Sequence, residues 1–159
     1  MNNKVRLDKK SRYKNGLYEP INKDKYIGDI NNIIYRSSWE LKLCKFLDAN
    51  KSVVYWNSEN LQIPYLYTVD NKVHKYHVDF VAKMKTSDGS LKTYVIEVKP
   101  EAETLPPKTR NKKRLILDTE TFIKNQCKWE AARKYCSENN ATFLVLTEYD
   151  LCIKQRKSK

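Results

Sequence analysis

Two stretches near the middle of the chain, Tyr76–Ala82 and Lys92–Lys99, alternate apolar and polar residues with the period of a β-strand. We expect the apolar residues to face a hydrophobic core: Val78, Phe80 and Ala82 in the first stretch, and Tyr94, Ile96 and Val98 in the second. This places Asp79 on the opposite face of the first strand, and Glu97 and Lys99 on that of the second. Neighbouring strands would therefore bring two carboxylates and a lysine together on an exposed cleft face.

The remaining strands are predicted on both sides of this pair. Leu61–Tyr65 is followed by turn residues, so it should join the pair in a three-strand antiparallel meander, and Ser52–Trp56 begins extended structure. Ala141–Thr147 is a near-continuous apolar run, the pattern of a strand in the centre of a sheet.

Two helices complete the expected domain. Arg36–Asp48 has apolar residues at helical spacing and a ready N-cap in Ser37 or Ser38. A second helix is predicted from Thr119 to Asn139. The apolar face expected for the first helix comprises Trp39, Leu43, Phe46 and Leu47. The element order predicts an α/β fold in which a mixed β-sheet is flanked by helices.

The charge of the chain favours a polyanionic partner. Its 31 Lys and Arg residues outnumber 19 Asp and Glu residues, which gives a net charge of +12. A generally solubilising surface is the alternative. No apolar run is long enough to span a bilayer, and the first residues lack a signal-peptide pattern, so we expect a cytoplasmic protein without a membrane partner.

The 159 residues suggest one domain with basic extensions. We expect a basic N-terminal arm over residues 1–30, the domain itself over 31–151, and a basic C-terminal tail over 152–159. A basic loop is predicted near residues 100–117, after the prolines at 106 and 107. The residues expected to contact DNA phosphates are Lys108, Arg110, Lys112, Lys113 and Arg114 in this loop, and Lys128 on the second helix, for which a solvated helix face is the alternative.

A carboxylate pair beside a lysine is suited to phosphodiester hydrolysis with Mg²⁺, for which Mn²⁺ can substitute. Carboxylate oxygens are hard ligands for such an ion, and the ion and the lysine together offset negative charge at a phosphate. The four cysteines contain no C-x-x-C pair and predict no zinc site. An ordinary surface salt bridge is the alternative explanation of Glu97-Val-Lys99 taken by itself.

Asp79, followed by Glu97-x-Lys99, resembles the D…(D/E)xK motif of the PD-(D/E)xK nucleases, with Val78 where proline is usual. The resemblance implies a restriction-endonuclease-like core with Asp79, Glu97 and Lys99 as catalytic residues. It also carries an acidic role over to Glu40, in the first turn of the first helix, so that Asp79, Glu97 and Glu40 would hold the metal. For Glu40 the alternative is a favourable charge near a helix N-terminus.

Longer strings, including Tyr35-Arg-Ser-Ser-Trp-Glu40, Glu97-Val-Lys-Pro100 and Lys128-Trp-Glu-Ala-Ala132, resemble the head-completion nucleases of T-even-like tailed phages. That family is similar in its core to the TnsA-type transposon endonucleases. The resemblance implies a metal-dependent endonuclease that processes packaged phage DNA, in the host cytoplasm or associated with the virion. It leaves open contacts with phage head or portal proteins and a homodimer. A non-catalytic DNA-binding virion protein, or a nuclease of transposition or repair, are the alternatives.

Overall fold

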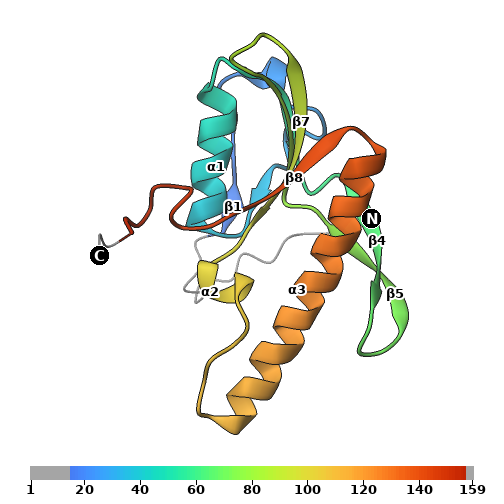
Figure 1. Ribbon diagram of the computed structural model, residues 1–159. Coiled ribbons are helices and arrows are strands. Elements are labelled where there is room, and N and C mark those ends of the chain that lie inside the picture. The colour runs from blue at the N-terminus through green and yellow to red at the C-terminus, as the bar shows by residue number, and fades with distance from the viewer. Residues whose placement is uncertain (1–14, 157–159) are drawn as a thin grey trace.

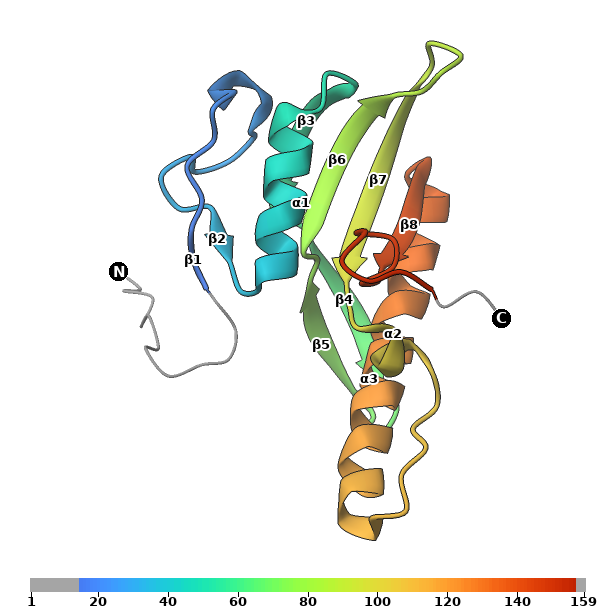
Figure 2. The ribbon, with the colours of Figure 1, turned by 90° about the vertical axis from the view of Figure 1, so that its left-hand side faces the viewer.

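The computed structural model describes residues 15–156. The elements, in chain order, are β1 (Gly16–Leu17), the 3-10 turn η1 (Lys23–Lys25), β2 (Ile34–Tyr35), α1 (Ser38–Ala49), β3 (Val53–Ser58), β4 (Gln62–Tyr67), β5 (Lys72–His77), β6 (Phe80–Lys85), β7 (Leu91–Val98), α2 (Glu101–Thr104), α3 (Lys112–Glu138) and β8 (Ala141–Leu146). Figures 1 and 2 show their arrangement. Within this part of the chain, no helix combines the length and the apolar character that crossing a membrane requires.

The main sheet has the strand order β3-β6-β7-β8. β3 and β6, and β6 and β7, pair antiparallel, whereas β8 pairs parallel to β7 after the crossover through α3. This confirms the predicted mixed sheet flanked by helices. The expectation that β8 is central is wrong, because β8 is an edge strand. Its apolar run has another cause: Phe143 packs on the α3 side of the sheet and Leu146 on the α1 side, so both faces of the edge strand are covered.

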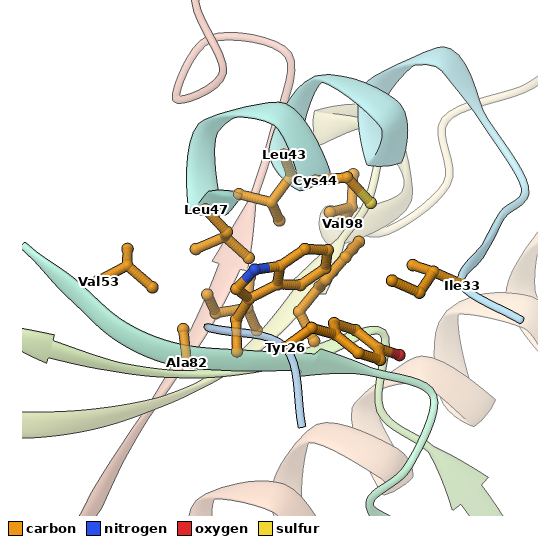
Figure 3. Close-up of a cluster of buried hydrophobic side chains, with 11 residues drawn as sticks. Tyr26, Ile33, Leu43, Cys44, Leu47, Val53, Ala82 and Val98 are labelled. Atoms are coloured by element: carbon orange, nitrogen blue, oxygen red, sulfur yellow. The ribbon is translucent and has the colours of Figure 1, made fainter. Parts of the chain in front are cut away.

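Two hydrophobic clusters hold the layers together. The first joins Leu43, Cys44 and Leu47 of α1 to the facing side of β3, β6 and β7, with Trp56 completely buried. Figure 3 shows this cluster between α1 and the sheet, with Ile33 from the N-terminal region at the end away from Val53, and Tyr26 beside the strands. The second cluster lies on the other side of the sheet, between α3 and the β4–β5 hairpin.

The chain bends between β5 and β6, so these are two separate strands. The predicted three-strand meander is therefore wrong. β4 and β5 form a separate two-stranded sheet, while β6 and β7 belong to the main sheet. At the break, the amide of Val78 donates to the carbonyl of Leu61 and the carbonyl of Asp79 accepts from the amide of Glu59. Val78 therefore packs in the α3-side cluster and Phe80 in the α1-side cluster, although strand alternation had placed both on one face.

The buried face of α1 also differs from the prediction. Phe46 is 50% exposed, and Asp48 is buried instead. The carboxylate of Asp48 accepts hydrogen bonds from the amides of Ile21 and Asn22 and from the Tyr18 hydroxyl, at 2.8 to 2.9 Å. A buried carboxylate is stable only with such partners.

These contacts fix the N-terminal region to the domain. The basic arm expected over residues 1–30 is too long, because from residue 15 onward the chain packs against α1 and β3. η1 lies beside β3, and the amide of Ile27 donates to the carbonyl of Trp56. The first 14 residues of the expected arm lie outside the described residues.

α3 begins at Lys112, earlier than the predicted Thr119, so the basic loop over residues 100–117 is a wrong prediction in part. Asn111 is the N-cap, and its side chain accepts a hydrogen bond from the amide of Arg114. Arg114 pairs with Asp118 one turn later, which supports helix in this stretch. The first half of α3 extends beyond the sheet next to α2 (Figures 1 and 2). Lys112, Lys113 and Arg114 are thus the first turn of a helix, and Lys108 and Arg110 remain in a loop.

Candidate active site

Asp79 is half-buried and lies in the bend that separates β5 from β6. The prediction that it lies inside a strand is wrong. Its Oδ2 accepts a hydrogen bond of 2.8 Å from the amide of Val98, at the end of β7. Because β6 and β7 pair with Phe80 opposite Ile96, the bend holds Asp79 against the strand end that carries Glu97 and Lys99. The predicted meeting of these three side chains is confirmed in position, although the bend produces it.

Glu97 is buried, with 2% of its surface exposed, whereas an exposed cleft face was predicted. Its Oε2 accepts a 2.6 Å hydrogen bond from the Tyr76 hydroxyl. Its Oε1 lies 3.4 Å from the Nζ of Lys99. Glu97 is buried because the strand is interrupted at Val78, and this interruption lets the β4–β5 hairpin fold so that Tyr76 covers this side of β7. Both oxygens of Glu97 are therefore held by neighbours.

Glu40 completes the acidic group from the first turn of α1. Its amide donates to the Ser37 side chain, whose hydroxyl donates back to Oε1 at 3.1 Å. Its Oε2 accepts from the amide of Arg36 at 2.8 Å. Ser37 is the N-cap, and Glu40 stands at the third helical position as in a capping box, but its carboxylate accepts from the Arg36 amide and the Ser37 hydroxyl. Its place at the helix N-terminus is the one that the alternative explanation requires, and its role as a metal ligand stays a prediction. Burial raises the pKa of Glu40, and the negative charge of Glu59 adds to this, while the Arg36 amide and Ser37 oppose it.

The carboxylates lie close enough to disturb one another. Burial raises the pKa of Asp79 well above its ordinary value, and the charges of Glu97 and Glu40 add to the rise. For Lys99, burial opposes the charged form, but Glu97 and Asp79 outweigh it and raise the pKa. Lys99 therefore stays protonated. It lies beside a group of carboxylates whose negative charge it only partly neutralises.

A second lysine reaches this group from α3. The Nζ of Lys128 lies 5.4 Å from the centre of the Tyr76 ring, a cation–π distance. Burial lowers the pKa of Lys128, and the attraction of Glu97 only partly offsets it. Lys128 thus lies beside the acidic group, and its expected contact with a DNA phosphate stays a prediction. Burial also raises the pKa of Tyr76, helped by the charge of Glu97, so this residue remains a neutral hydrogen-bond donor.

Sequence reasoning missed Tyr76 and Arg36, and it left Glu59 out of the site. Strand alternation put Tyr76 on the face away from Asp79, and no periodic signal marks the break that reverses this. Arg36 and Glu59 are 23 residues apart and form a two-pronged ion pair in which Nε lies 2.6 Å from Oε1 and Nη2 lies 3.1 Å from Oε2. Only the packing of β3 beside the start of α1 reveals that pair.

The acidic group suits a hard divalent cation by its chemistry, since all the available ligands are carboxylate oxygens. Asp79 uses only Oδ2 for the hydrogen bond to Val98, which leaves Oδ1 for another ligand. Within residues 15–156, however, no three acidic, histidine or cysteine side chains stand at mutual distances that would hold a metal. Gathering Glu40 with Asp79 and Glu97 would require side-chain movement. A hollow of about 440 Å³ borders the group and is lined by Arg36, Ser37, Ser38, Trp39, Glu40, Val98, Lys99, Pro100 and Glu103.

The basic cluster lies apart from this hollow. Lys108 and Arg114 line a second hollow of about 620 Å³, between α2, the following loop and α3. Glu103 lines both hollows, so the two are neighbours. Lys108, Arg110, Lys112, Lys113 and Arg114 are all exposed, and their expected contact with DNA stays a prediction.

Two comparisons with known proteins bear on this site. The family described as "TnsA-like endonuclease N terminal" matches residues 50–148, a range that contains Asp79, Glu97, Lys99 and Lys128. Over 139 residues, the chain is 36% identical to the head completion nuclease of Enterobacteria phage T4, covering 84% of this chain and 90% of that protein. Both kinships expected from the sequence motifs are confirmed.

Proposed function

The chain belongs to the TnsA-like endonuclease family, and we propose that it is a metal-dependent endonuclease that hydrolyses phosphodiester bonds of DNA. One observation carries the proposal. The bend at Asp79 brings its carboxylate to the end of β7, where Glu97 and Lys99 are held. A structural salt bridge between Glu97 and Lys99 would not account for a second, half-buried carboxylate, that of Asp79, with a free oxygen.

Each side chain has a separate task in this proposal. Asp79, Glu97 and Glu40 would hold Mg²⁺ or Mn²⁺, which would supply Lewis-acid activation of the phosphate and of a water molecule. Lys99, kept protonated by its carboxylate neighbours, offers its Nζ to a non-bridging phosphate oxygen and offsets the charge that develops there. Tyr76 orients Glu97 through its hydroxyl. Lys128, above the Tyr76 ring, binds a phosphate beside the site.

The proposed biological step follows the named relative. We assign the protein to head completion, with packaged phage DNA as the substrate and phage head or portal proteins as candidate partners. This places it in the host cytoplasm, with association with the virion as a further expectation. The TnsA-like family match favours a second candidate, a nuclease that cuts transposon ends. Action in DNA repair, and a non-catalytic DNA-binding virion protein that keeps the nuclease fold, are the remaining alternatives.

The test is cleavage of plasmid DNA by the purified protein, with Mg²⁺, with Mn²⁺ and with EDTA. We expect nicking or linearisation with either metal and none with EDTA. Asp79→Asn is the matched control, because it keeps the shape of the side chain and removes its charge. Full activity in EDTA would refute metal dependence, and binding without cleavage by the wild-type protein would favour the virion structural alternative.

A panel of substrates separates the nuclease alternatives. Linear duplex, single-stranded, flapped and branched DNA, and a duplex with a transposon end, are compared at equal concentration. Preference for linear duplex or its ends supports processing of packaged DNA. Selective cleavage at the transposon end would instead support the TnsA-like task.

A further inference from the structure

Arg36 lines the hollow beside the candidate active site and forms an ion pair with Glu59, and neither residue has a role in the function proposed above. Arg36 precedes α1, and Glu59 follows β3. Two N–H groups of the guanidinium, on Nε and Nη2, donate to the two carboxylate oxygens. A guanidinium has five N–H donors, so this pairing fixes its plane and leaves three donors for another acceptor.

The backbone on both sides of this ion pair is connected to two residues that are proposed to bind the metal, Glu40 and Asp79. The backbone amide of Arg36 donates to Glu40, and the backbone amide of Glu59 donates to the carbonyl of Asp79. The negative charges of Glu40 and Asp79 also act on the guanidinium and contribute to the rise in the pKa of Arg36, after the larger effect of Glu59. The backbone of Arg36 is therefore held by Glu40, and its guanidinium, held by Glu59, feels the charges of the site.

The backbone of Glu59 gives independent support. Its φ angle is +53°, in the left-handed region that residues with side chains seldom occupy. Such strain persists where the surrounding structure requires it, often at functional sites. Glycine or asparagine would relieve the strain, but neither could form the charged two-pronged pair with Arg36. The glutamate at this strained position therefore supplies the carboxylate that binds Arg36.

The surroundings of Arg36 indicate what its remaining donors can reach. The Arg36 side chain is 63% exposed, and it lines the hollow of about 440 Å³ together with Glu40 and Lys99. This volume is within the usual range for ligand sites. A polyanion in this hollow therefore lies between residues that include both Lys99 and Arg36.

We infer that Arg36 is a backbone-binding residue for DNA, which holds a phosphate adjacent to the scissile one while Glu59 fixes its orientation. This inference rests on the proposed endonuclease function and names a further subsite of it. Arginine suits the task because its planar, permanently charged group can donate to phosphate oxygens while two of its donors remain on a carboxylate. Prior fixation by Glu59 reduces the side-chain entropy lost on binding.

The salt dependence of DNA binding tests the inference without any requirement for cleavage. Binding isotherms of the full chain on a duplex oligonucleotide in EDTA are recorded over a salt series. We expect Arg36→Ala to weaken binding by about 10-fold, as for removal of a charge-assisted hydrogen bond. We also expect the slope of log K against log salt to fall by about 0.9, the value for one neutralised phosphate. Glu59→Gln should keep the slope, because it retains the guanidinium.

Arg156→Ala is the matched control. Arg156 also pairs with a glutamate, Glu101, at 2.9 Å, and the exposures of the two ion pairs are similar. It does not line the hollow beside Lys99. We expect Arg156→Ala to leave the slope unchanged. Equally weakened binding in both variants would show a general effect of surface charge and overturn the inference.

Thermal unfolding and single-turnover cleavage separate binding from a purely structural role. If Arg36→Ala lowers Tm while the salt slope stays at its wild-type value, the pair only holds β3 to α1 and the inference is wrong. With saturating protein, cleavage should slow in Arg36→Ala and not in Arg156→Ala. If wild-type protein binds DNA but does not cut it, the slope still tests the Arg36 contact, whereas the proposed endonuclease function fails separately.

Discussion

The hydroxyl of Tyr76 donates a hydrogen bond of 2.6 Å to Oε2 of Glu97, and both residues are buried. The two come from different sheets, since Tyr76 belongs to the β4–β5 hairpin and Glu97 to β7. A buried carboxylate with a fixed donor keeps one orientation, which is the usual role of residues that support a ligand to a metal. The hairpin therefore orients a proposed catalytic group from outside the main sheet.

Tyr76→Phe tests this orientation with almost no change in shape. We expect the Mg²⁺ concentration for half-maximal cleavage to rise by about 10–100-fold, the usual effect of removing such a supporting hydrogen bond. The measurement is a Mg²⁺ titration of the cleavage rate. Tyr65→Phe, in the same hairpin and outside the site, is the control. An unchanged Mg²⁺ requirement in Tyr76→Phe would remove the tyrosine from the site.

Asp79→Asn and Glu97→Gln should abolish cleavage, with rates reduced by about 100-fold or more, since each removes a proposed metal ligand. Amide substitutions suit Glu97 better than alanine. Glu97→Ala would leave the buried Tyr76 hydroxyl without its acceptor, which lowers the free energy of unfolding by about 1–3 kcal/mol. Plasmid cleavage and urea unfolding, measured on the same preparations, separate an effect on chemistry from an effect on stability. Near wild-type cleavage by either variant would refute the assignment.

Lys99 and the basic cluster should differ in what they control. Neutralising Lys108, Arg110, Lys112, Lys113 and Arg114 should weaken binding on all sequences and lower the salt slope by about 0.9 for each phosphate that the variant no longer neutralises. Lys99→Ala should slow single-turnover cleavage of bound DNA with a much smaller change in slope. A salt series paired with cleavage at saturating protein makes this comparison. Normal turnover in Lys99→Ala, or an unchanged slope in the cluster variant, would contradict the respective role.

Asp48 should contribute stability that depends on pH. Burial by itself would raise the pKa of Asp48, but the amides of Ile21 and Asn22 and the Tyr18 hydroxyl outweigh it, so the pKa is lowered. A lowered pKa in the folded state stabilises the protein above the unfolded value of about 3.9, and this contribution disappears as the pH falls through the folded-state pKa.

Asp48→Asn should therefore lower the free energy of unfolding by about 1–3 kcal/mol at pH 7. The difference from wild type should shrink below about pH 4. Urea unfolding between pH 7 and pH 3 measures it. Asp118→Asn is a control, because Asp118 has an exposed partner on the same helix. A difference that stays constant over this range would show that the charge of Asp48 is not involved.

The sequence by itself determined the mixed α/β class and the residues of the acidic group. Alternation in Lys92–Val98 is a local property of the backbone, and it placed Ile96 and Val98 in the α1-side core and Glu97 on the other side. The N-cap at Ser37 is equally local, because its side chain accepts from the amide of Glu40, three residues further on.

Only the tertiary structure decided the features that depend on contacts between distant residues. The break at Val78 follows from the packing of Val78 against α3 and of Phe80 against α1, which no local pattern encodes. It moved Asp79 out of a strand, buried Glu97 under Tyr76, and separated the β4–β5 hairpin from the main sheet. The start of α3 is set by the N-cap at Asn111. The edge position of β8 is set by the order of the strands in the sheet. Alternation gives the face of a residue only within an unbroken strand, and packing decides where the strand breaks.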